Sequence, residues 1–273
     1  MKRKFRDWIL LGFLTVMACI FLAPLVWTIM TSFKPTNEMF SLPPTLWVAG
    51  KMGFHNYGSA FTKHQVHIAM MNSVAVTILQ IFFQLLVPAL AAYPLATMRF
   101  PGRNAIFYGI LATMMIPQFG MLVPAFKVVA LLKLINNYGG LILPSAASAF
   151  GVFLLRQYYC RLPRDFFDAG IVDGANQFTL WFRIALPLAK PALAALAIYT
   201  FTGSWKALLW PMLILQKVKL FTLPIRLFFM ISGYAQDYAS LMAGATIGAI
   251  IPIVFFLFFQ SQFIEGLSGG IKG

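Results

Sequence analysis

The chain has 273 residues, of which 60% are hydrophobic and only 10% are charged, and its mean hydropathy is +0.80. About a quarter of the residues of a soluble domain are charged, so this composition excludes a soluble globular protein and predicts a membrane protein. The formal net charge of +14 does not indicate a nucleic-acid-binding protein, because the basic residues are scattered along the flanks of apolar segments.

Six apolar segments are long enough for transmembrane helices, each of which needs about 20 residues to cross the hydrocarbon core. They lie at residues 8–31, 68–95, 105–130, 139–158, 191–215 and 240–260. The sequence therefore predicts an all-α membrane protein with six transmembrane helices in a single domain, residues 1–273. Prolines interrupt several segments, which is typical either of helices that line a cavity or of ordinary kinks in a bundle.

The distribution of Lys and Arg favours a cytoplasmic N-terminus, since cytoplasmic loops carry an excess of these residues. With six spans the C-terminus is then cytoplasmic too. The cytoplasmic segments hold twelve basic residues: Lys2, Arg3, Lys4, Arg6, Arg99, Arg103, Arg156, Arg161, Arg164, Arg183, Lys190 and Lys272. The outer segments hold eight, over longer loops: Lys34, Lys51, Lys63, Lys127, Lys133, Lys217, Lys219 and Arg226.

A polar segment, residues 159–190, separates the fourth apolar segment from the fifth and lies on the cytoplasmic side of this topology. Three of the chain's seven acidic residues are in it: Asp165, Asp168 and Asp173. Pro163 suits an early helical position, and Asp165 and Asp168 suit a first helical turn, where negative charge is favourable.

The second half of the polar segment carries a turn and a further helix start. Gly174 can take the left-handed conformation that ends a helix. Asn176 can begin a second short helix, and Pro187 is expected to close it before the fifth apolar segment. The segment therefore predicts a helix–turn–helix that is too polar to span the membrane. An amphipathic helix that merely lies on the headgroups is the alternative reading.

The spacing within this segment resembles a loop of a known transporter family. Asp168-Ala169-Gly170, then Asp173-Gly174-Ala175, then Ile184-Ala185-Leu186-Pro187 resembles the Glu-Ala-Ala loop of the membrane subunits of bacterial ABC importers. Two positions depart from the pattern. Asp168 replaces Glu and keeps the charge with a shorter reach, and Gly170 replaces the second Ala and is expected to loosen the helix.

The resemblance implies that this loop couples the chain to ATPase subunits. The residues that it assigns to this contact are Asp165, Asp168, Ala169, Gly170, Asp173, Gly174, Ala175, Ile184, Leu186 and Pro187.

Other segments are similar to the maltose-type sugar permeases, and to the smaller, maltose-G-like permease in particular. They are residues 72–73, 150–157, 162–163, 241–245 and 265–273. The resemblance implies the type I ABC importer permease fold in the cytoplasmic (inner) membrane of a bacterium or archaeon. The glycine-rich tail then either approaches the ATPases or forms a flexible terminus.

The resemblance also implies the partners of the chain. They are a second, usually different permease, two ATP-binding cassette subunits and an extracytoplasmic solute-binding protein that delivers a sugar. The sequence itself contains no G-x-x-x-x-G-K-[ST] phosphate loop, so ATP is expected to be used by partner subunits, with no cofactor bound directly. His55, His64 and His67 lack the spacing of a metal site and are expected to lie in a solvated loop that contacts the binding protein.

The fifth apolar segment holds the candidate substrate pathway, Gly203, Ser204, Trp205 and Lys206. Gly203 and Ser204 permit close helix approach or an exposed backbone, and Trp205 can stack on a sugar ring. Lys206 is a charged residue inside an apolar segment, which by default indicates a functional site and favours an anionic or highly hydroxylated substrate. The alternatives are ordinary packing with a lipid-facing Trp205 and a Lys206 that snorkels to the outer face.

Two other classes of membrane protein fit the sequence less well. An ion-coupled secondary transporter needs carboxylates within the membrane, and Asp7, at the edge of the first segment, is the only candidate. An intramembrane enzyme needs a catalytic pair or metal ligands at membrane depth, and the apolar segments contain none. The sequence therefore predicts a transport protein and not an enzyme.

Overall fold

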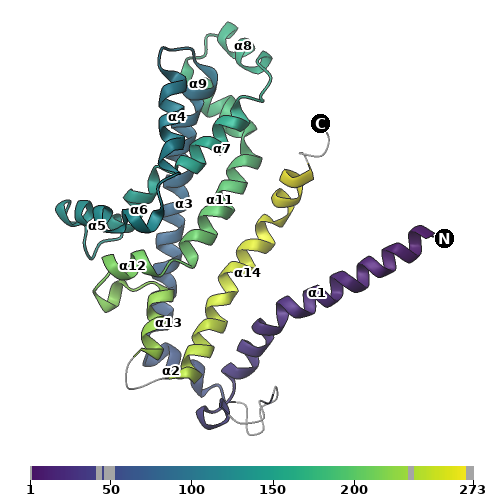
Figure 1. Cartoon of the computed structure of the whole chain (residues 1–273), viewed down its shortest axis with the longest axis vertical. Helices are drawn as coiled ribbons and strands as arrows, with labels where there is room; N and C mark the ends of the chain where they lie inside the picture. The colour runs from purple at the N-terminus through teal and green to yellow at the C-terminus, as the bar shows by residue number, and fades with distance from the viewer. Residues whose placement is uncertain (1, 41–44, 46–52, 233–236, 269–273) are drawn as a thin grey trace. The chain divides into compact units, whose positions relative to one another are not determined.

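The computed structural model describes residues 2–40, 45, 53–232 and 237–268, and all regular elements among them are helical (Figure 1). The chain divides into two compact units. Unit 1 comprises Met1–Met70 and Ile225–Ile251, and unit 2 comprises Met71–Pro224 and Pro252–Gly273. The last five residues of the predicted glycine-rich tail lie outside the described residues.

Three helices are long and apolar enough to cross a membrane on their own. They are α1 (Lys2–Ser32), α3 (Val66–Thr97) and α14 (Tyr238–Ser268), which cover the first, second and sixth predicted segments. Each continues through at least one internal proline. These prolines therefore do not end the helices, in line with the tolerance for proline in membrane helices.

Two predicted segments form bent pairs of helices in place of single ones. Residues 105–130 contain α4 (Arg103–Thr113) and α5 (Leu122–Leu131), and the break between them bends the chain by 94°. Residues 139–158 contain α6 (Gly139–Ala146) and α7 (Ala149–Tyr159), with a bend of 42°. A third bent pair joins residues 177–188 to residues 190–205 with a bend of 74°. The described residues hold six candidate spans only if each of these three bent pairs is counted as one, so six spans stay a prediction.

The fifth segment is not the single helix predicted for residues 191–215. Helix α11 (Lys190–Trp205) has 16 residues, a length of about 24 Å at 1.5 Å per residue, and α12 (Leu209–Ile214) follows after a break. Pro211 explains the break, because in a continuous helix its ring would collide with the carbonyl four residues earlier. In the new helix Pro211 lies in the first turn, where no helical hydrogen bond is lost.

The core of unit 2 joins α3, α4, α7 and α11 to the polar segment between α7 and α11. Fifteen buried residues form it: Ala89, Ala92, Tyr93, Leu95, Phe107, Val152, Leu155, Tyr159, Phe167, Leu180, Trp181, Ala185, Ala189, Ala192 and Leu196. Many are small, which lets membrane helices approach closely. Gly151 shows this directly, since a Cβ atom there would lie 3.0 Å from Pro88 and 3.2 Å from Leu196.

Unit 1 packs the end of α1 against α2 (His55–Thr62). The buried side chain of Asn56 donates to the carbonyl oxygens of Ser32 and Lys34, both at 2.8 Å. These carbonyls lie where α1 ends and has no internal donors left. Most of α13 (Leu223–Ile231) also belongs to this unit, and Leu227 packs so closely on Gly244 that a Cβ atom would lie 2.9 Å away.

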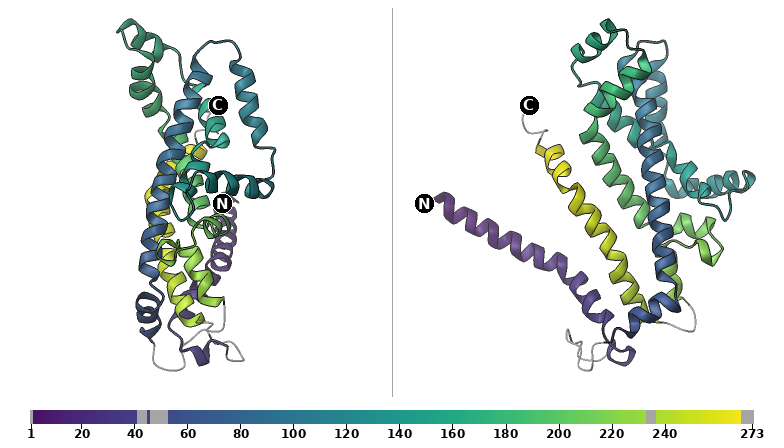
Figure 2. Two further views of the ribbon diagram at one scale, coloured as in Figure 1. Left: turned by 90° about the vertical axis from the view of Figure 1, so that its left-hand side faces the viewer. Right: turned by 180° about the vertical axis from the view of Figure 1, so that it is seen from behind.

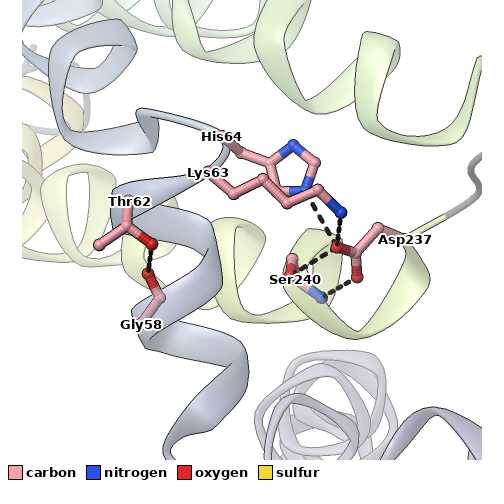
Figure 3. A network of polar contacts seen from close by, with 6 residues as sticks. All are labelled: Gly58, Thr62, Lys63, His64, Asp237 and Ser240. Atoms are coloured by element: carbon pink, nitrogen blue, oxygen red, sulfur yellow. Dashed lines mark hydrogen bonds and ion pairs between the residues drawn. The ribbon is translucent and has the colours of Figure 1, made fainter.

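A polar clasp, formed by Lys63, His64, Asp237 and Ser240, joins the start of α14 to the α2–α3 turn in unit 1 (Figure 3). Oδ2 of Asp237 lies 2.9 Å from Nε2 of His64 and 3.4 Å from Nζ of Lys63. The Ser240 amide donates to Oδ1 of Asp237 at 3.0 Å, as the first turn of a helix does to its N-cap. The side chain of His64 therefore contacts Asp237, whereas the sequence predicted that it lies in a solvated loop.

The clasp also changes the acidity of Asp237. Partial burial alone would raise the pKa of this carboxyl group, but hydrogen bonds from His64 and from the amide and hydroxyl of Ser240 lower the pKa to about 2. Asp237 is thus ionised throughout the ordinary pH range, and it supplies a fixed negative charge that faces His64 and Lys63.

Candidate functional site

The predicted helix–turn–helix is present in unit 2, and its first limb is α8 (Asp165–Val172). Asp165 and Asp168 lie in the first turn, as expected, but Pro163 lies before the helix because Arg164 is its N-cap. Gly174, with φ of +80°, ends the limb in the left-handed conformation. The amides of Gly174 and Ala175 donate to the carbonyls of Ile171 and Gly170, which is the Schellman arrangement of a helix end.

The second limb begins at Asn176, whose Oδ1 accepts from the Thr179 amide at 2.8 Å. It continues as α9 (Gln177–Leu180), a π-helical turn (Trp181–Ala185) and α10 (Leu186–Leu188). The helix formed by these three elements ends at Leu188, one residue beyond Pro187, which was predicted to close it. The bend comes at Ala189, before α11.

The second limb is anchored to the last turns of α3, and Figure 2 shows the helix–turn–helix at this end of the helix. Trp181 is buried and its Nε1 donates to the carbonyl of Ala89 at 3.2 Å. Tyr93 donates its hydroxyl hydrogen to Oε1 of Gln177 at 3.1 Å, and its ring packs on Phe167 of the first limb. The loop is therefore an extension of the unit 2 core and not a separate surface segment.

The two limbs contact each other at Gly170, which is buried. A Cβ atom at this position would lie 2.6 Å from Cδ2 of Leu180 and 3.0 Å from Cδ1 of Ile184. The expectation that Gly170 loosens the helix is thus wrong for the packed loop, because the missing side chain is what lets the limbs meet.

The outer surface of the loop is both apolar and acidic. Large side chains exposed on it are Phe166, Ile171, Val172, Phe178 and Phe182. Within the part of the chain that the structure describes, the carboxylates of Asp165, Asp168 and Asp173 have no hydrogen bond or ion pair. Such a surface fits a partner protein that supplies apolar contacts and cationic or N–H donor groups.

The ten predicted coupling residues divide by exposure. Six are exposed: Asp165, Asp168, Ala169, Asp173, Gly174 and Pro187. Three are half-buried: Ala175, Ile184 and Leu186. Gly170 alone is buried.

The four candidate pathway residues lie at the end of α11, and they do not form one cluster. Gly203 is exposed, and no atom of another described helix lies within 4 Å of a Cβ position there, so among the described residues it makes no close helix contact. Oγ of Ser204 lies 2.9 Å from Oγ1 of Thr77 on α3. Trp205 stacks on Phe201, which in turn stacks on Phe255 with ring centroids 3.8 Å apart.

Lys206 is exposed and follows the last residue of α11. It therefore lies at a helix end. The prediction from the sequence, which placed it inside a continuous span, is wrong on this point. A cation is favourable there, because the carbonyl groups at a helix C-terminus carry partial negative charge.

A polar seam on α3 was missed by the sequence reading. Ser73, Thr77, Gln80 and Gln84 recur at intervals of four, three and four residues and thus share one face of the helix. Ser73 accepts from the Leu223 amide at 2.7 Å, and Gln80 donates to the Leu141 carbonyl at 3.0 Å. Thr77 pairs with Ser204, and Gln84 accepts from Thr200, so two bonds of the seam reach α11.

Comparison with known proteins identifies the family. Residues 84–263 match the family described as the binding-protein-dependent transport system inner membrane component. The chain belongs to this family. The matched residues include both limbs of the helix–turn–helix and all of α11, which are therefore parts of an importer permease.

Individual permeases are similar over nearly the whole chain. The arabinooligosaccharides transport system permease protein AraQ of Bacillus subtilis is 37% identical over 96% of this chain and 94% of its own length. The diacetylchitobiose uptake system permease protein NgcG of Streptomyces coelicolor is 32% identical over 94% of this chain and 86% of its own.

A solved structure shares the fold of the permease. It is a crystal structure of a bacterial ABC transporter involved in the import of the acidic polysaccharide alginate, with a TM-score of 0.82 and 22% identity. The match covers 96% of this chain and 98% of that one, and it confirms the fold of an ABC importer permease.

Proposed function

We propose that the chain is a membrane-spanning permease subunit of an ATP-driven ABC importer and that it translocates a carbohydrate by alternating access. The names of AraQ and NgcG, which are transport proteins for oligosaccharides, support this substrate class. We further propose an oligosaccharide, a sugar or a related polyol as cargo, delivered by an extracytoplasmic solute-binding protein.

The observation that carries the proposal is the anchored helix–turn–helix with its exposed apolar and acidic surface. Trp181 and Phe167 fix it in the core of unit 2, while Val172 and Phe178 face outward. Two ATP-binding cassette subunits would bind this surface and the corresponding surface of a second permease. ATP would be bound and hydrolysed by those subunits, with no cofactor bound by this chain.

The anchoring suggests how motion passes from the loop to the helices. Displacement of the loop would move α3 through the Trp181–Ala89 and Tyr93–Gln177 hydrogen bonds. It would move α11 through the shared core, which includes Ala189 and Leu196. A change between two packed arrangements of this kind is how closure at one site is carried to another.

The orientation follows from the function. If the loop docks on ATPases it is cytoplasmic, and the bias of Lys and Arg then places both termini in the cytoplasm of a bacterial or archaeal cell. Ser204, Trp205 and Lys206 would line the substrate pathway near the outer ends of the helices. Lys206 would then favour an anionic or highly hydroxylated substrate.

The proposal is tested by isolating the chain from membranes and assaying what comes with it. We expect ATPase subunits to copurify, and we expect Phe178→Ala to weaken their binding, because this side chain is 64% exposed on the loop. The matched control is Tyr108→Ala on α4, an aromatic that is 65% exposed away from the loop, and it should leave ATPase binding unchanged.

Transport supplies the second measurement. Uptake of a sugar by proteoliposomes should require ATP and should fall in the Phe178→Ala variant in proportion to the lost ATPase subunits. Isolation without any ATPase, together with ATP-independent uptake, would overturn the assignment.

A further inference from the structure

A small basic cavity lies in unit 2 between the end of α3 and the start of α4. It has a volume of about 290 Å³ and is lined by Arg99, Phe100, Gly102, Arg103, Asn104 and Ala105. No function proposed above uses this cavity, and no coupling residue lines it.

Two nearby arginines donate hydrogen bonds to backbone carbonyl groups at the end of α3. Arg103 donates to the carbonyl of Met98, and Arg156 donates to the carbonyl of Leu95, both at 3.0 Å. Cations at a helix C-terminus stabilise the carbonyls that have no internal partner. Arg99 is different, because in the described part of the chain its exposed guanidinium has no hydrogen bond or ion pair.

Neither Arg99 nor Arg103 forms an ion pair with a carboxylate among the residues that the structure describes. The uncompensated charge of Arg99 and Arg103 therefore faces the cavity. The two guanidinium groups offer an anion charge-assisted hydrogen bonds with no competing acid in the lining.

The start of α4 adds hydrogen-bond donors to the cavity. Gly102, with φ of +82°, precedes the helix, no side chain caps it, and its first turn has no acidic residue. Within the described residues the backbone N–H groups of Asn104 and Ala105 have no acceptor. Unpaired amides at a helix start attract anions, and phosphate groups in particular.

We propose that this basic cavity binds the phosphate of an anionic phospholipid headgroup. A lipid is favoured over a free anion by the surroundings of the cavity. The spanning helix α3 ends at Thr97, two residues before Arg99, which places the cavity at the membrane surface. Phe100 and Ile106 are exposed beside it and offer an apolar surface to the acyl chains.

The position of the cavity along α3 indicates which leaflet of the membrane supplies the lipid. Tyr93, one turn before the end of α3, bonds to Gln177 of the helix–turn–helix, so the α3–α4 connection that lines the cavity and the helix–turn–helix lie at the same end of α3. Figure 2 shows this connection and the helix–turn–helix together. The lipid therefore comes from the leaflet on the coupling side. Basic pockets at membrane depth are known to select acidic headgroups in this way.

Native mass spectrometry of the full chain, purified with its accompanying subunits, tests the proposal. The probes are phosphatidylglycerol and phosphatidylcholine with the same acyl chains. We expect Arg99→Gln to weaken retention of phosphatidylglycerol about fivefold, as the loss of one cation near a charged membrane surface predicts. Retention of phosphatidylcholine should not change, and Arg99→Lys, which keeps the charge, should retain phosphatidylglycerol.

Arg161→Gln is the matched control, because Arg161 is also exposed, lies in the turn before α8 and has no side-chain partner among the described residues. It should retain phosphatidylglycerol as the unaltered chain does. An equal loss in Arg99→Gln and Arg161→Gln, or in Arg99→Lys, would overturn the site. Displacement of the lipid by an equal concentration of inorganic phosphate would overturn the lipid as its occupant.

Discussion

Helix α3 in unit 2 and the polar clasp in unit 1 hold their neighbours by different chemistry. The seam on α3 and the Trp181–Ala89 bond are neutral, and Trp181 and Thr77 are buried. The clasp is ionic, and the Lys63 side chain is 61% exposed. Neutral bonds suit a helix that crosses a membrane, where an unpaired charge is costly. An ion pair suits a helix end that water reaches, and it alone should respond to pH and salt.

The largest effect expected from this comparison is that of Trp181→Ala. Removing a buried indole leaves a cavity and removes the hydrogen bond from Trp181 to Ala89, so the free energy of unfolding should fall by about 3–5 kcal/mol. Thermal unfolding of the detergent-solubilised chain measures this loss. Phe178→Ala, three residues earlier but exposed, should change the stability by less than about 0.5 kcal/mol. Equal losses would show that the loop is not part of the core.

Asp237→Asn should have the next largest effect, because it removes the charge that pairs with His64 and Lys63 while keeping an acceptor for the Ser240 amide. We expect a loss of about 1.5–3 kcal/mol, in the range of hydrogen bonds to a charged group. The melting temperature of the solubilised chain is the measurement, and an unchanged value would contradict a structural role for the clasp.

The difference in stability between the unaltered chain and Asp237→Asn should depend on pH in a definite direction. Since the pKa of Asp237 is lowered from 3.8 to about 2, its contribution is fully present above pH 3.8 and is lost as the pH falls through about 2. The melting temperatures of the unaltered chain and of Asp237→Asn should therefore converge as the pH falls through that window. Convergence near neutral pH would contradict the clasp geometry.

Gln84→Leu tests the neutral seam. The substitution removes the acceptor of the buried Thr200 hydroxyl, and hydrogen bonds between membrane helices contribute about 0.6 kcal/mol on average and about 1.7 at most. The resulting loss should be independent of pH and salt. Thr202→Val is the control, because the Thr202 hydroxyl is exposed and bonds only within its own helix.

The smallest effect is expected from Lys63→Gln. A half-exposed ion pair contributes about 0.2–1 kcal/mol and is screened by salt. The difference in melting temperature from the unaltered chain should therefore disappear at high ionic strength, and a difference that persists there would mean that Lys63 acts by packing.

The sequence predicted the features that depend on local backbone chemistry. The left-handed turn at Gly174 and the helix start at Asn176 were both found from residue type and position, and the structure confirms them. The coupling function of the ten loop residues stays a prediction, because no partner chain touches them here.

Features that depend on neighbours far along the chain were not predicted. Gly170 looks like a weak point in a helix until Leu180 and Ile184 are placed beside it. The clasp joins residues 173 apart, and hydropathy alone cannot pair His64 with Asp237. The polar seam was visible in principle as four polar residues on one face of an apolar helix, and only the start of that helix was singled out.

The π-helical turn at Trp181–Ala185 sets the residue spacing within the second limb of the helix–turn–helix. The Leu186 amide donates to the Trp181 carbonyl, five residues back, so this turn contains one residue more than an α-helical turn. A π turn absorbs this extra residue locally, so the winding on either side of it stays that of an ordinary helix. One residue more therefore fits between the Asp-Gly-Ala turn and Pro187 than an unbroken α-helix of the same extent would hold. Across this turn Trp181 contacts α3 while Phe182 stays exposed to a partner.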